Sequence, residues 1–428
     1  MPEACREPLA AQARTLARAG KWQPASDKLC QLIGEVVGIP ARHLEINRDQ
    51  YSLNSLNGRV TLADDRTLFF KYHHEEGEDH TIEEYYRAGL LRDHGFRVDV
   101  PLYACGEPGR QILLYQLRND RRLADVCRDI ELSGDWDGMG AVVGAQQRAD
   151  AEILALTLPT LRPGQAADVV TEPIHQLFYH RLMSPGDTPG LGGRVKQFYV
   201  DQTFKLGDES LSWQTLSNLQ WEINGVRYGH TLRQLFLEAA VVLAPGSLAN
   251  HGVVVAHGDA HNANVWFDTH ADQPQLVSFD PAFAGSHIPA LLAEVKATFH
   301  NIFAHPHWLY EPAQATDCYQ LSVKRRGDTL EVRHDWQLTP LRAAFLNSKG
   351  ERYWRPLLRE LKARGWLPRH WQRIVRLALF CCPMLVLDLR ADGGSGHTSV
   401  SSPLGLSLAV MLGSEGDDAF NQWLQQLI

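Results

Sequence analysis

The sequence is poor in the features of a disulfide-bonded, metal-clustered or membrane-embedded chain. Its seven cysteines are scattered over 428 residues, their number is odd, and none forms a Cys-x-x-Cys pair. This pattern argues against a disulfide framework or a zinc site and favours reduced thiols. The most apolar stretch, Leu377 to Leu387, is shorter than the roughly 20 residues that span a bilayer, and Pro383 lies within it. We therefore expect a buried, kinked helix there and no membrane partner.

An apolar signal core is also missing from the N-terminal segment, which charged residues such as Glu3 and Arg6 interrupt. Together with the cysteine pattern, this predicts a cytoplasmic protein. Basic charge is not in surplus, because 42 Lys and Arg against 50 Asp and Glu give a net charge of −8. A dedicated nucleic-acid binder carries a strong basic surplus, so we expect no nucleic-acid partner. The sequence makes no prediction of oligomeric state.

What the first 118 residues do contain is the pattern of a small antiparallel lobe. Thr67–Tyr72 is a clear strand, and its alternation places Lys71 on the same face as Phe69. Thr81 and Glu84 have the Thr-x-x-Glu spacing of a capping box at the start of a helix. The elements expected are a helical segment over 1–45, a polar turn over 51–58, strands over 59–62 and 67–72, a helix over 81–94, and strands or strand edges over 98–101, 102–105 and 111–117.

The remaining chain, 119–428, is predicted to be mostly helical. Val253–Ala256 and Gln275–Phe279 are short strands within it, and the segment from about 288 onward is mainly helical. Helices are also expected over 146–156, 172–183 and 231–243. A small sheet-containing lobe followed by a larger helical lobe is an α+β organisation.

The segment that carries the chemistry follows the strand at 253–256 and reads His257-Gly258-Asp259-Ala260-His261-Asn262-Ala263-Asn264. A further aspartate, Asp280, comes directly after the next strand. Phosphoryl transfer is mostly positioning plus charge neutralisation. One carboxylate must orient the attacking hydroxyl and accept its proton, while an amide and a second carboxylate hold Mg²⁺, which prefers oxygen ligands. The two aspartates and Asn264 supply this set.

The pattern His-Gly-Asp-x-His-x-x-Asn, followed by Phe-Asp, resembles the catalytic and metal-binding motifs of the aminoglycoside phosphotransferase and choline kinase-like superfamily. The resemblance implies the bilobal fold of protein kinases, with Asp259 as the catalytic base and Asn264 and Asp280 as Mg²⁺ ligands. It also implies that His257 is a scaffold residue of the loop, and we expect His261 to make a structural hydrogen bond. Protein kinases carry an arginine before the aspartate, whereas this chain has a glycine, and the departure favours a small-molecule kinase.

The resemblance extends to the first lobe, so that it covers about 46–118 and 250–300. Lys71 looks like the family's phosphate-contacting lysine, and Glu84 in the following helix looks like its ion-pair partner. The turn before the first strand would lie over the phosphates, and residues 114–117 stand where the hinge between the lobes would pair with the purine. The nucleotide-binding residues expected on this basis are Asn54, Ser55, Asn57, Gly58, Lys71, Glu84, Tyr115 and Leu117.

Fold and function follow from the resemblance as expectations. A helical segment over 1–45 should precede a nucleotide-binding lobe over 46–118 with a small antiparallel sheet. A large helical lobe over 119–428 should hold the catalytic loop 257–264, the metal-binding Asp280 and the acceptor site, with an insertion within about 119–250. The expected reaction phosphorylates a hydroxyl of a sugar, aminocyclitol, aminoglycoside or other natural-product alcohol. ATP or GTP and Mg²⁺ are the expected cofactors, and a small-molecule hydroxyl acceptor is the expected partner.

Other interpretations of the same residues stay open. Lys71 could be an ordinary strand lysine, Glu84 could be only a helix cap with Glu83 as the ion-pair partner, and the loop at Asp259 could be a set of Asx turns. A nucleotide-binding pseudokinase or regulatory module would keep the fold without the reaction, but such chains have usually lost one of these residues. A metal-dependent phosphatase could use His257 and its neighbours as ligands, yet it leaves Lys71 and Glu84 unexplained.

The acceptor pocket should lie between the catalytic loop and the C-terminal helices. Only Glu294 is acidic in the stretch after Asp280, over 281–308, so a polycationic antibiotic is not specially indicated. The C-terminal helices are basic, which a solvated helix face would explain. The alternative is an anionic group on the acceptor, such as a carboxylate or a phosphate. The basic residues concerned are Arg342, Lys349, Arg352, Arg355, Arg359, Lys362, Arg364, Arg369, Arg373 and Arg376.

Overall fold

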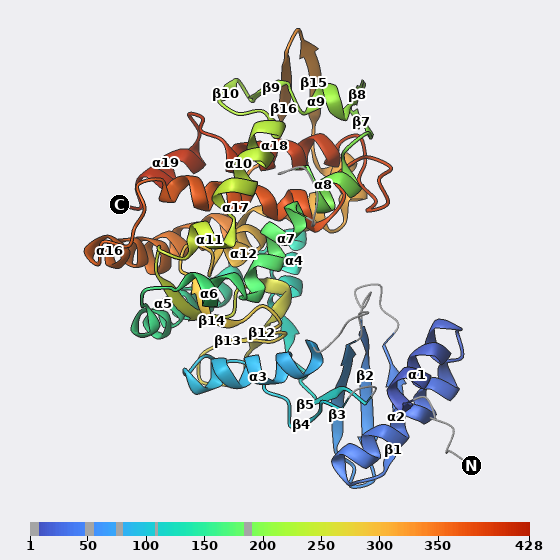
Figure 1. Cartoon of the computed structure of the whole chain (residues 1–428). Coiled ribbons are helices and arrows are strands. Elements are labelled where there is room, and N and C mark those ends of the chain that lie inside the picture. The colour runs from blue at the N-terminus through green and yellow to red at the C-terminus, as the bar shows by residue number, and fades with distance from the viewer. Residues whose placement is uncertain (1–7, 48–54, 74–79, 108–109, 184–190) are drawn as a thin grey trace. The chain divides into compact units, whose positions relative to one another are not determined.

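The computed structural model of the chain describes residues 8–47, 55–73, 80–107, 110–183 and 191–428 (Figure 1). The chain forms two compact units. The first contains the residues up to Asp120 together with 277–282, and the second contains 121–276 together with 283–428. The predicted α+β fold is confirmed, because the first unit holds an antiparallel sheet and the second is mainly helical.

The first unit is built on a five-stranded antiparallel sheet that two helices precede. Its elements are α1 (Leu9–Arg18), α2 (Trp22–Val37), β1 (Ala41–Ile46), β2 (Ser55–Leu62), β3 (Thr67–His73), α3 (His80–Asp93), β4 (Tyr103–Cys105) and β5 (Ile112–Gln116). The strand order is β1-β2-β3-β5-β4. Apolar side chains of α2 and of the sheet, including Leu29, Ile33 and Phe70, are fully buried and form a core that belongs to this unit alone.

β3 shows the predicted alternation of its side chains. Leu68, Phe70 and Tyr72 are buried in the core of the first unit, whereas Phe69 and Lys71 stand on the opposite, less buried face. Successive side chains of a strand point to opposite sides of the sheet. The lysine is therefore kept out of the apolar core and is held on the other face of the sheet.

The turn predicted over 51–58 is wrong for its described part, because Ser55–Gly58 forms the beginning of β2. Gly58 pairs with Ile46 of β1 and with Phe70 of β3. A Cβ atom at this position would lie 1.9 Å from the carbonyl oxygen of Glu45. The glycine is thus required by the close approach of β1. In the sequence, a glycine required for this reason cannot be distinguished from a glycine in a turn.

The second unit packs its helices around one large buried core. The helices expected over 146–156 and 231–243 are present, while the one expected over 172–183 is broken into a 3₁₀ turn at Pro173–Leu177 and a short helix. The helices are α4 (Leu123–Ser133), α5 (Met139–Thr157), α6 (Ala166–Val170), α7 (Tyr179–Leu182), α8 (Gly193–Phe198), α9 (Trp213–Leu216), α10 (Leu232–Val242), α11 (Pro245–Leu248), α12 (Val295–Thr298), α13 (Pro306–Leu309), α14 (Ala315–Cys318), α15 (Pro340–Lys349), α16 (Arg355–Ala363), α17 (Trp371–Val386), α18 (Ser401–Gly413) and α19 (Ala419–Gln425).

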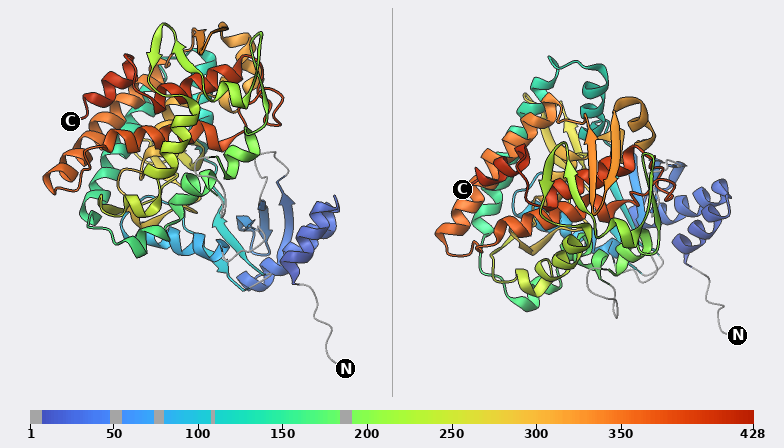
Figure 2. Two further views of the ribbon diagram at one scale, coloured as in Figure 1. Left: turned by 45° about the horizontal axis from the view of Figure 1, so that its top comes forward. Right: turned by 90° about the horizontal axis from the view of Figure 1, so that it is seen from above.

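α17 is the buried helix that the apolar stretch predicts, and Figure 2 shows it running beside α18. Every residue from Ile374 to Leu385 is buried. Pro383 lies inside the helix but only three residues before its end at Val386, so its missing N–H removes a single hydrogen bond of the last turn. Among the described residues, no helix combines the length and the apolar character needed to cross a membrane.

Strands are more numerous in the second unit than the sequence predicts. They are β6 (Arg121–Arg122), β7 (Thr203–Leu206), β8 (Glu209–Ser212), β9 (Gln220–Ile223), β10 (Val226–Tyr228), β11 (Val253–Ala256), β12 (Val265–Asp268), β14 (Gly285–Pro289), β15 (Leu321–Arg326) and β16 (Thr329–His334), while β13 (Gln275–Ser278) lies where the chain passes between the units. Two hairpins join into a sheet of order β10-β9-β16-β15, in which β9 and β16 are parallel. The chain beyond 288 is mostly helical as predicted, apart from the hairpin at 321–334.

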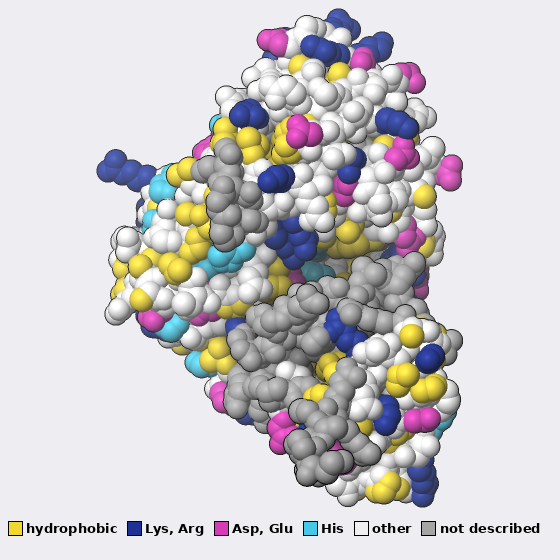
Figure 3. Space-filling model, turned by 45° about the vertical axis from the view of Figure 1, so that its right-hand side comes forward, with side chains coloured by type: hydrophobic (Ala, Val, Ile, Leu, Met, Phe, Trp, Pro, Cys, Tyr) yellow, Lys and Arg dark blue, Asp and Glu magenta, His cyan; other side chains and the backbone are white. Residues whose placement is uncertain are grey.

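Charges of both signs are mixed on the surface. On the face that Figure 3 shows, Lys and Arg side chains are interspersed with Asp and Glu side chains. Exposed ion pairs, such as Arg42 with Asp65 at 2.7 Å and Arg66 with Asp64 at 2.7 Å, contribute little to stability because water screens them. Neither sign of charge forms a separate patch of its own on this face.

Two basic residues predicted on a solvated helix face lie in the core instead. Arg342 donates two hydrogen bonds to Glu131, at 2.6 Å and 3.0 Å. Lys349 lies 2.5 Å from Asp150 and 2.9 Å from Glu294, and all three side chains are buried. Burial opposes the charged form of Lys349, but the two carboxylates outweigh it and raise the pKa of the lysine. These cations serve the packing of the second unit.

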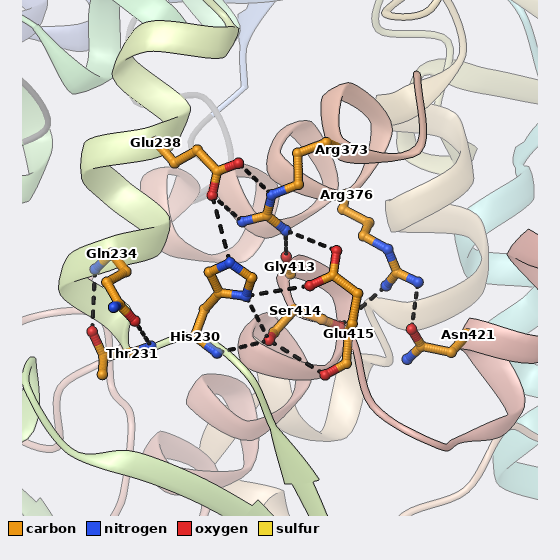
Figure 4. Close-up of polar contacts among 10 residues, drawn as sticks. All are labelled: His230, Thr231, Gln234, Glu238, Arg373, Arg376, Gly413, Ser414, Glu415 and Asn421. Carbon is orange, nitrogen blue, oxygen red and sulfur yellow. Dashed lines mark hydrogen bonds and ion pairs between the residues drawn. The ribbon is translucent and has the colours of Figure 1, made fainter. Parts of the chain in front are cut away.

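Figure 4 shows that Arg373 and Arg376 of α17 are also engaged within the second unit. The guanidinium of Arg373 lies 2.5 Å from Glu238 of α10 and donates to the carbonyl oxygen of Gly413. Arg376 donates to the side chain of Asn421 and is buried. Arg352, Arg359, Lys362, Arg364 and Arg369 are exposed, as a solvated helix face predicts. Neither sequence interpretation anticipates the internal pairing of four other cations, Arg342, Lys349, Arg373 and Arg376.

We expect the substitution Lys349→Met to lower the stability of the protein by about 3–5 kcal/mol, because it leaves two buried carboxylates without their cation. The midpoint of urea unfolding, followed by tryptophan fluorescence, measures the loss. Lys362→Met is the matched control, since Lys362 is exposed on the neighbouring helix α16 and a surface change of this kind stays within about 0.5 kcal/mol. Equal midpoints for the two variants would contradict a supporting role for the buried ion pairs.

Candidate active site

The segment from His257 to Asn264 leaves the fully buried strand β11, which pairs antiparallel with β14. Gly258 has a φ of +78°, in the left-handed region that glycine adopts without strain. A Cβ atom on Gly258 would lie 2.7 Å from Cδ1 of Ile174 and 2.9 Å from the carbonyl oxygen of Phe283. Both the turn and the lack of space therefore require a glycine at this position.

Asp259 is fixed through its own backbone. Its N–H donates to Nδ1 of His257 at 3.3 Å, and its carbonyl oxygen accepts from the N–H of His261 at 2.8 Å and from Nδ2 of Asn264 at 3.0 Å. His261 in turn accepts a hydrogen bond at Nδ1 from the N–H of Ala263, at 3.3 Å, and so caps the short 3₁₀ turn Asn262–Asn264. The loop thus holds Asp259 in one position. The bond from Asn264 to Asp259 uses the amide nitrogen of Asn264 and does not involve its amide oxygen.

The side chain of Asp259 is almost buried and faces a chain of histidines. Nε2 of His261 lies 3.8 Å from Oδ1 of Asp259, and the ring of His261 lies 4.6 Å from that of His300. Nε2 of His300 accepts from the ammonium of Lys296 at 2.8 Å, and its Nδ1 contacts the hydroxyl of Tyr310. Burial and the charge of Lys296 lower the pKa of His300 well below its ordinary value. The imidazole is therefore neutral, as an acceptor from an ammonium must be.

Within the first unit, Lys71 of β3 forms an ion pair with Asp280. Nζ of Lys71 lies 2.8 Å from Oδ1 of Asp280, and the two side chains are 13% and 40% exposed. Asp280 has a φ of +56°, a conformation that costs free energy for a residue other than glycine and is typical of functional positions. The segment that carries it is held to this unit by Asp99, whose N–H donates to the carbonyl oxygen of Ser278 at 2.9 Å.

The strand register places two other predicted nucleotide-binding residues on the face of Lys71. Asn57 of β2 pairs directly with Lys71, and Tyr115 of β5 pairs with Phe69, two residues before Lys71. Side chains of directly paired residues point to the same side of a sheet. Asn57, Lys71 and Tyr115 therefore share one face, whereas Gly58 pairs with the next position along the strand and belongs to the other.

The remaining predicted residues of this unit are described in part. Leu117 follows the end of β5 and is partly buried. Ser55 begins β2 and Glu84 lies in α3, and for both of them the structure describes the backbone only. Asn54 lies outside the described residues. The expected ion pair between Lys71 and Glu84 therefore stays a prediction.

The residues present fit Mg²⁺ and a nucleoside triphosphate in their donor chemistry. The amide oxygen of Asn264 and the carboxylate of Asp280 are oxygen ligands of the kind that Mg²⁺ prefers. The ammonium of Lys71 is a compact charge that suits phosphate oxygens, and the ion pair already brings it beside an aspartate. Each of these residues therefore has the donor chemistry of the role that the sequence predicts for it.

Three cations that the sequence did not single out interact with the catalytic segment or with one another. They are Arg181 of α7, Arg194 of α8 and Lys296 of α12. Burial lowers the pKa of Arg181 to about 10 and also lowers the pKa of Lys296, while the negative charge of Asp259 opposes both shifts. Lys296 has a signal that could have been noticed, since it is a lysine within the apolar run 290–299. The two arginines have none.

No protein-family model matches the chain, and no curated protein matches it. Among solved structures, the chain is similar to one described as macrolide 2′-phosphotransferase type I, at 13% identity and a TM-score of 0.41 over 90% of this chain and 94% of that one. It is similar to a microcompartment-associated aminopropanol kinase, at 13% identity and a TM-score of 0.38 over 87% and 90%. It is also similar to a structure of the GDP and kanamycin complex of APH(2")-IIia, at 11% identity and a TM-score of 0.40 over 83% of this chain and 88% of that one. These identities and TM-scores are too low to indicate a shared function.

We expect Gly258→Ala to destabilise the loop by about 1–3 kcal/mol, since the new side chain is strained at a positive φ and collides with Ile174 and Phe283. Thermal unfolding measures the effect. Gly246→Ala is the control, because a Cβ atom at Gly246 in α11 meets nothing within 4 Å and alanine favours a helix. A Gly258→Ala variant that unfolds at the temperature of the Gly246→Ala variant would show that the loop is not constrained as described.

Proposed function

We propose that the protein is a phosphotransferase that transfers the terminal phosphoryl group of ATP or GTP to a hydroxyl of a small molecule. The observation that carries the proposal is the ion pair between Lys71 and Asp280, at 2.8 Å across 209 positions of sequence. The family resemblance assigns Lys71 to the phosphates and Asp280 to Mg²⁺, each from a different segment of the sequence. Neither an ordinary strand lysine nor a self-capping loop accounts for their meeting.

Asp259 is the proposed catalytic base. Its carboxylate orients the acceptor hydroxyl and accepts the proton that the hydroxyl loses. The hydrogen bonds from His261 and Asn264 to its backbone carbonyl keep the carboxylate in place, which matters because phosphoryl transfer depends mainly on positioning. When bound, the nucleotide would supply the phosphoryl group, and Mg²⁺ would neutralise part of its charge. His257 and His261 act as scaffold residues of the loop.

The sheet of the first unit is the proposed nucleotide platform. Lys71 contacts the phosphates, Asn57 on the same face supports them through its amide, and the segment at Tyr115 and Leu117 meets the base. The six described cysteines are free thiols, in line with a cytoplasmic location. The acceptor is a small molecule with a hydroxyl group, bound by the second unit next to Asp259.

Asp259→Asn removes the proton acceptor and keeps the size of the side chain. We expect it to lower the turnover of a Mg²⁺–nucleotide with an acceptor by about 10²- to 10⁴-fold, the usual contribution of a general base. Affinity for the nucleotide should change little. A coupled assay of nucleoside diphosphate release, run over a panel of sugars, nucleosides, amino alcohols and hydroxy acids, measures the turnover.

The control for this variant is Asp272→Asn, since Asp272 is an exposed residue of the same unit. Turnover by Asp259→Asn at the level of this control would show that Asp259 is not the base. A wild-type protein that binds the nucleotide but turns over no acceptor of the panel would favour a pseudokinase. Release of phosphate from simple esters without any nucleotide would favour a phosphatase.

Lys71→Met and Asp280→Asn should each weaken binding of Mg²⁺–ATP by about tenfold or more, because each removes a charged contact to the triphosphate or its metal. Asp280→Asn should also reduce the dependence of binding on Mg²⁺. Titration calorimetry with and without Mg²⁺ measures both effects. Lys21→Met, a change of an exposed lysine in the same unit, is the control, and equal affinities for it and for Lys71→Met would refute the assigned role.

A further inference from the structure

Three aromatic rings stand in series beside the catalytic loop of the second unit. The ring centroid of His261 lies 4.6 Å from that of His300, with an angle of 30° between the ring planes. The ring of His300 lies 6.1 Å from that of Tyr310, at an angle of 26°. The series begins at the proposed base, because Nε2 of His261 is 3.8 Å from Oδ1 of Asp259. We call His261, His300 and Tyr310 the ring series.

Lys296 fixes the direction of the hydrogen bonds in the ring series. Its buried Nζ lies 2.8 Å from Nε2 of His300, one helical turn later. An ammonium can only donate a hydrogen bond, so Nε2 must be the accepting nitrogen of a neutral imidazole. The proton of that imidazole is then on Nδ1, which contacts the hydroxyl of Tyr310. His300 therefore donates to the hydroxyl oxygen of Tyr310.

The hydroxyl of Tyr310 consequently has a proton left to donate. A phenol hydroxyl carries one proton, and the bond from His300 uses its oxygen only. Burial and the negative charge of Asp259 raise the pKa of Tyr310, so the proton stays on the phenol at neutral pH. Within the part of the chain that the structure describes, this hydroxyl has no other hydrogen-bond partner. The proton is therefore available to a bound ligand.

Tyr310 is the most exposed member of the ring series. It is 40% exposed, whereas His300 is 5% exposed, and the two residues directly before Tyr310, Trp308 and Leu309, are fully buried. The segment after α13 thus presents Tyr310 at the surface of the second unit while its hydroxyl stays bonded to His300. A tyrosine in this position offers a ligand both an apolar ring and a polar tip.

We propose that Tyr310 is an acceptor-binding residue, whose hydroxyl donates a hydrogen bond to an oxygen of the acceptor, and that Lys296 is a positioning residue, which sets the direction of this bond through His300. The inference rests on the proposed function and narrows its substrate class. The acceptor must carry a second oxygen that accepts a hydrogen bond, besides the hydroxyl that Asp259 orients. Sugars, polyols and hydroxy acids carry one. Amino alcohols with a single hydroxyl do not, since their ammonium can only donate.

The tautomer of His300 tests the direction of the bonds without any acceptor. In protein with isotope-labelled histidine, NMR shows which ring nitrogen carries the proton, and the signals lost in His300→Gln identify this residue. We expect a neutral ring protonated at Nδ1 in the wild type. In Lys296→Met the proton should move to Nε2, since the hydroxyl of Tyr310 can then donate to Nδ1. Lys324→Met, at an exposed position of the same unit, should behave as the wild type does. A wild-type ring protonated at Nε2, or at both nitrogens, would overturn the inference.

Steady-state kinetics test the contact with the acceptor. The probe is the alcohol that the wild type turns over fastest in the panel of sugars, nucleosides, amino alcohols and hydroxy acids. Tyr310→Phe removes the hydroxyl and keeps the ring. We expect its KM for this alcohol to rise about three- to tenfold, the usual contribution of one hydrogen bond, with an unchanged KM for the nucleotide.

Tyr228→Phe is the matched control for the loss of a phenol hydroxyl. The hydroxyl of Tyr228 donates to Asp418 at 2.7 Å, and the residue is buried in the same unit. This variant should lower the unfolding midpoint and leave the KM for the alcohol unchanged. A Tyr310→Phe variant that behaves in the same way would show that Tyr310 is structural.

Lys296→Met separates a positioning role from a structural one, because Lys296 is buried and its side chain contacts His300. This variant should raise the KM for the alcohol as Tyr310→Phe does. The double variant Lys296→Met/Tyr310→Phe should bind the alcohol no worse than either single variant, since both changes remove the same hydrogen bond. Effects that multiply in the double variant would refute the link through His300.

The inference and the proposed function can fail separately. Turnover that Asp259→Asn abolishes, with an unchanged KM in Tyr310→Phe and Lys296→Met, would refute the inference and support the phosphotransferase. A fastest substrate with a single hydroxyl and no other oxygen would do the same. A wild type without turnover on any panel member would refute the proposed function and with it the acceptor role of Tyr310, while NMR would still decide whether Lys296 directs the hydrogen bonds.

Discussion

The candidate site depends on the backbone carbonyl of Asp259, which accepts hydrogen bonds from the N–H of His261 and from the side chain of Asn264. These bonds close the loop on itself, so that Asp259, the proposed base, and Asn264, the proposed metal ligand, cannot move independently. The closure is possible because Gly258 turns the chain at a positive φ where a side chain would strike Ile174 and Phe283. A spacing of five residues between Asp259 and Asn264 is thus a requirement of the loop as well as of the chemistry.

The second constraint is the treatment of buried charge. In the second unit, Arg342 and Lys349 are each paired with carboxylates, because an unpaired cation in the apolar interior would cost free energy. Around Lys296 it does not, and the nearest polar partner is a neutral histidine. A chain that pairs its buried cations in two places and leaves one without a carboxylate near its proposed base pays for the exception in stability.

The sequence carries these features unequally. The alternation of Thr67–Tyr72 predicted the face of Lys71, because strand period is a local property. The ion pair of Lys71 with Asp280 was not predicted, since it joins two segments that are distant in sequence. The prediction of a turn over 51–58 was wrong for its described part. Gly58 is required there because the backbone of β1 passes close to it, a contact that the local sequence does not show. The internal pairing of Arg342 and Lys349 was missed for the same reason. Whether Arg342 faces water or Glu131 is decided by tertiary packing, and a pattern of residue types contains no record of it.

The extra length of the chain has a similar explanation. The sequence predicted an insertion within about 119–250, but the strands β9 and β10 from that region form one sheet with β15 and β16, about a hundred residues later. The hairpin of β7 and β8 is tied to the segment after α17 by Lys205 with Asp392 at 2.7 Å and by the N–H of Gly207 with Ser399. Since α8 leads directly into this hairpin, the added strands hold α8 where Arg194 reaches the end of α17. The surplus therefore holds α8 against α17, and no motif reveals it, because its residues contact one another.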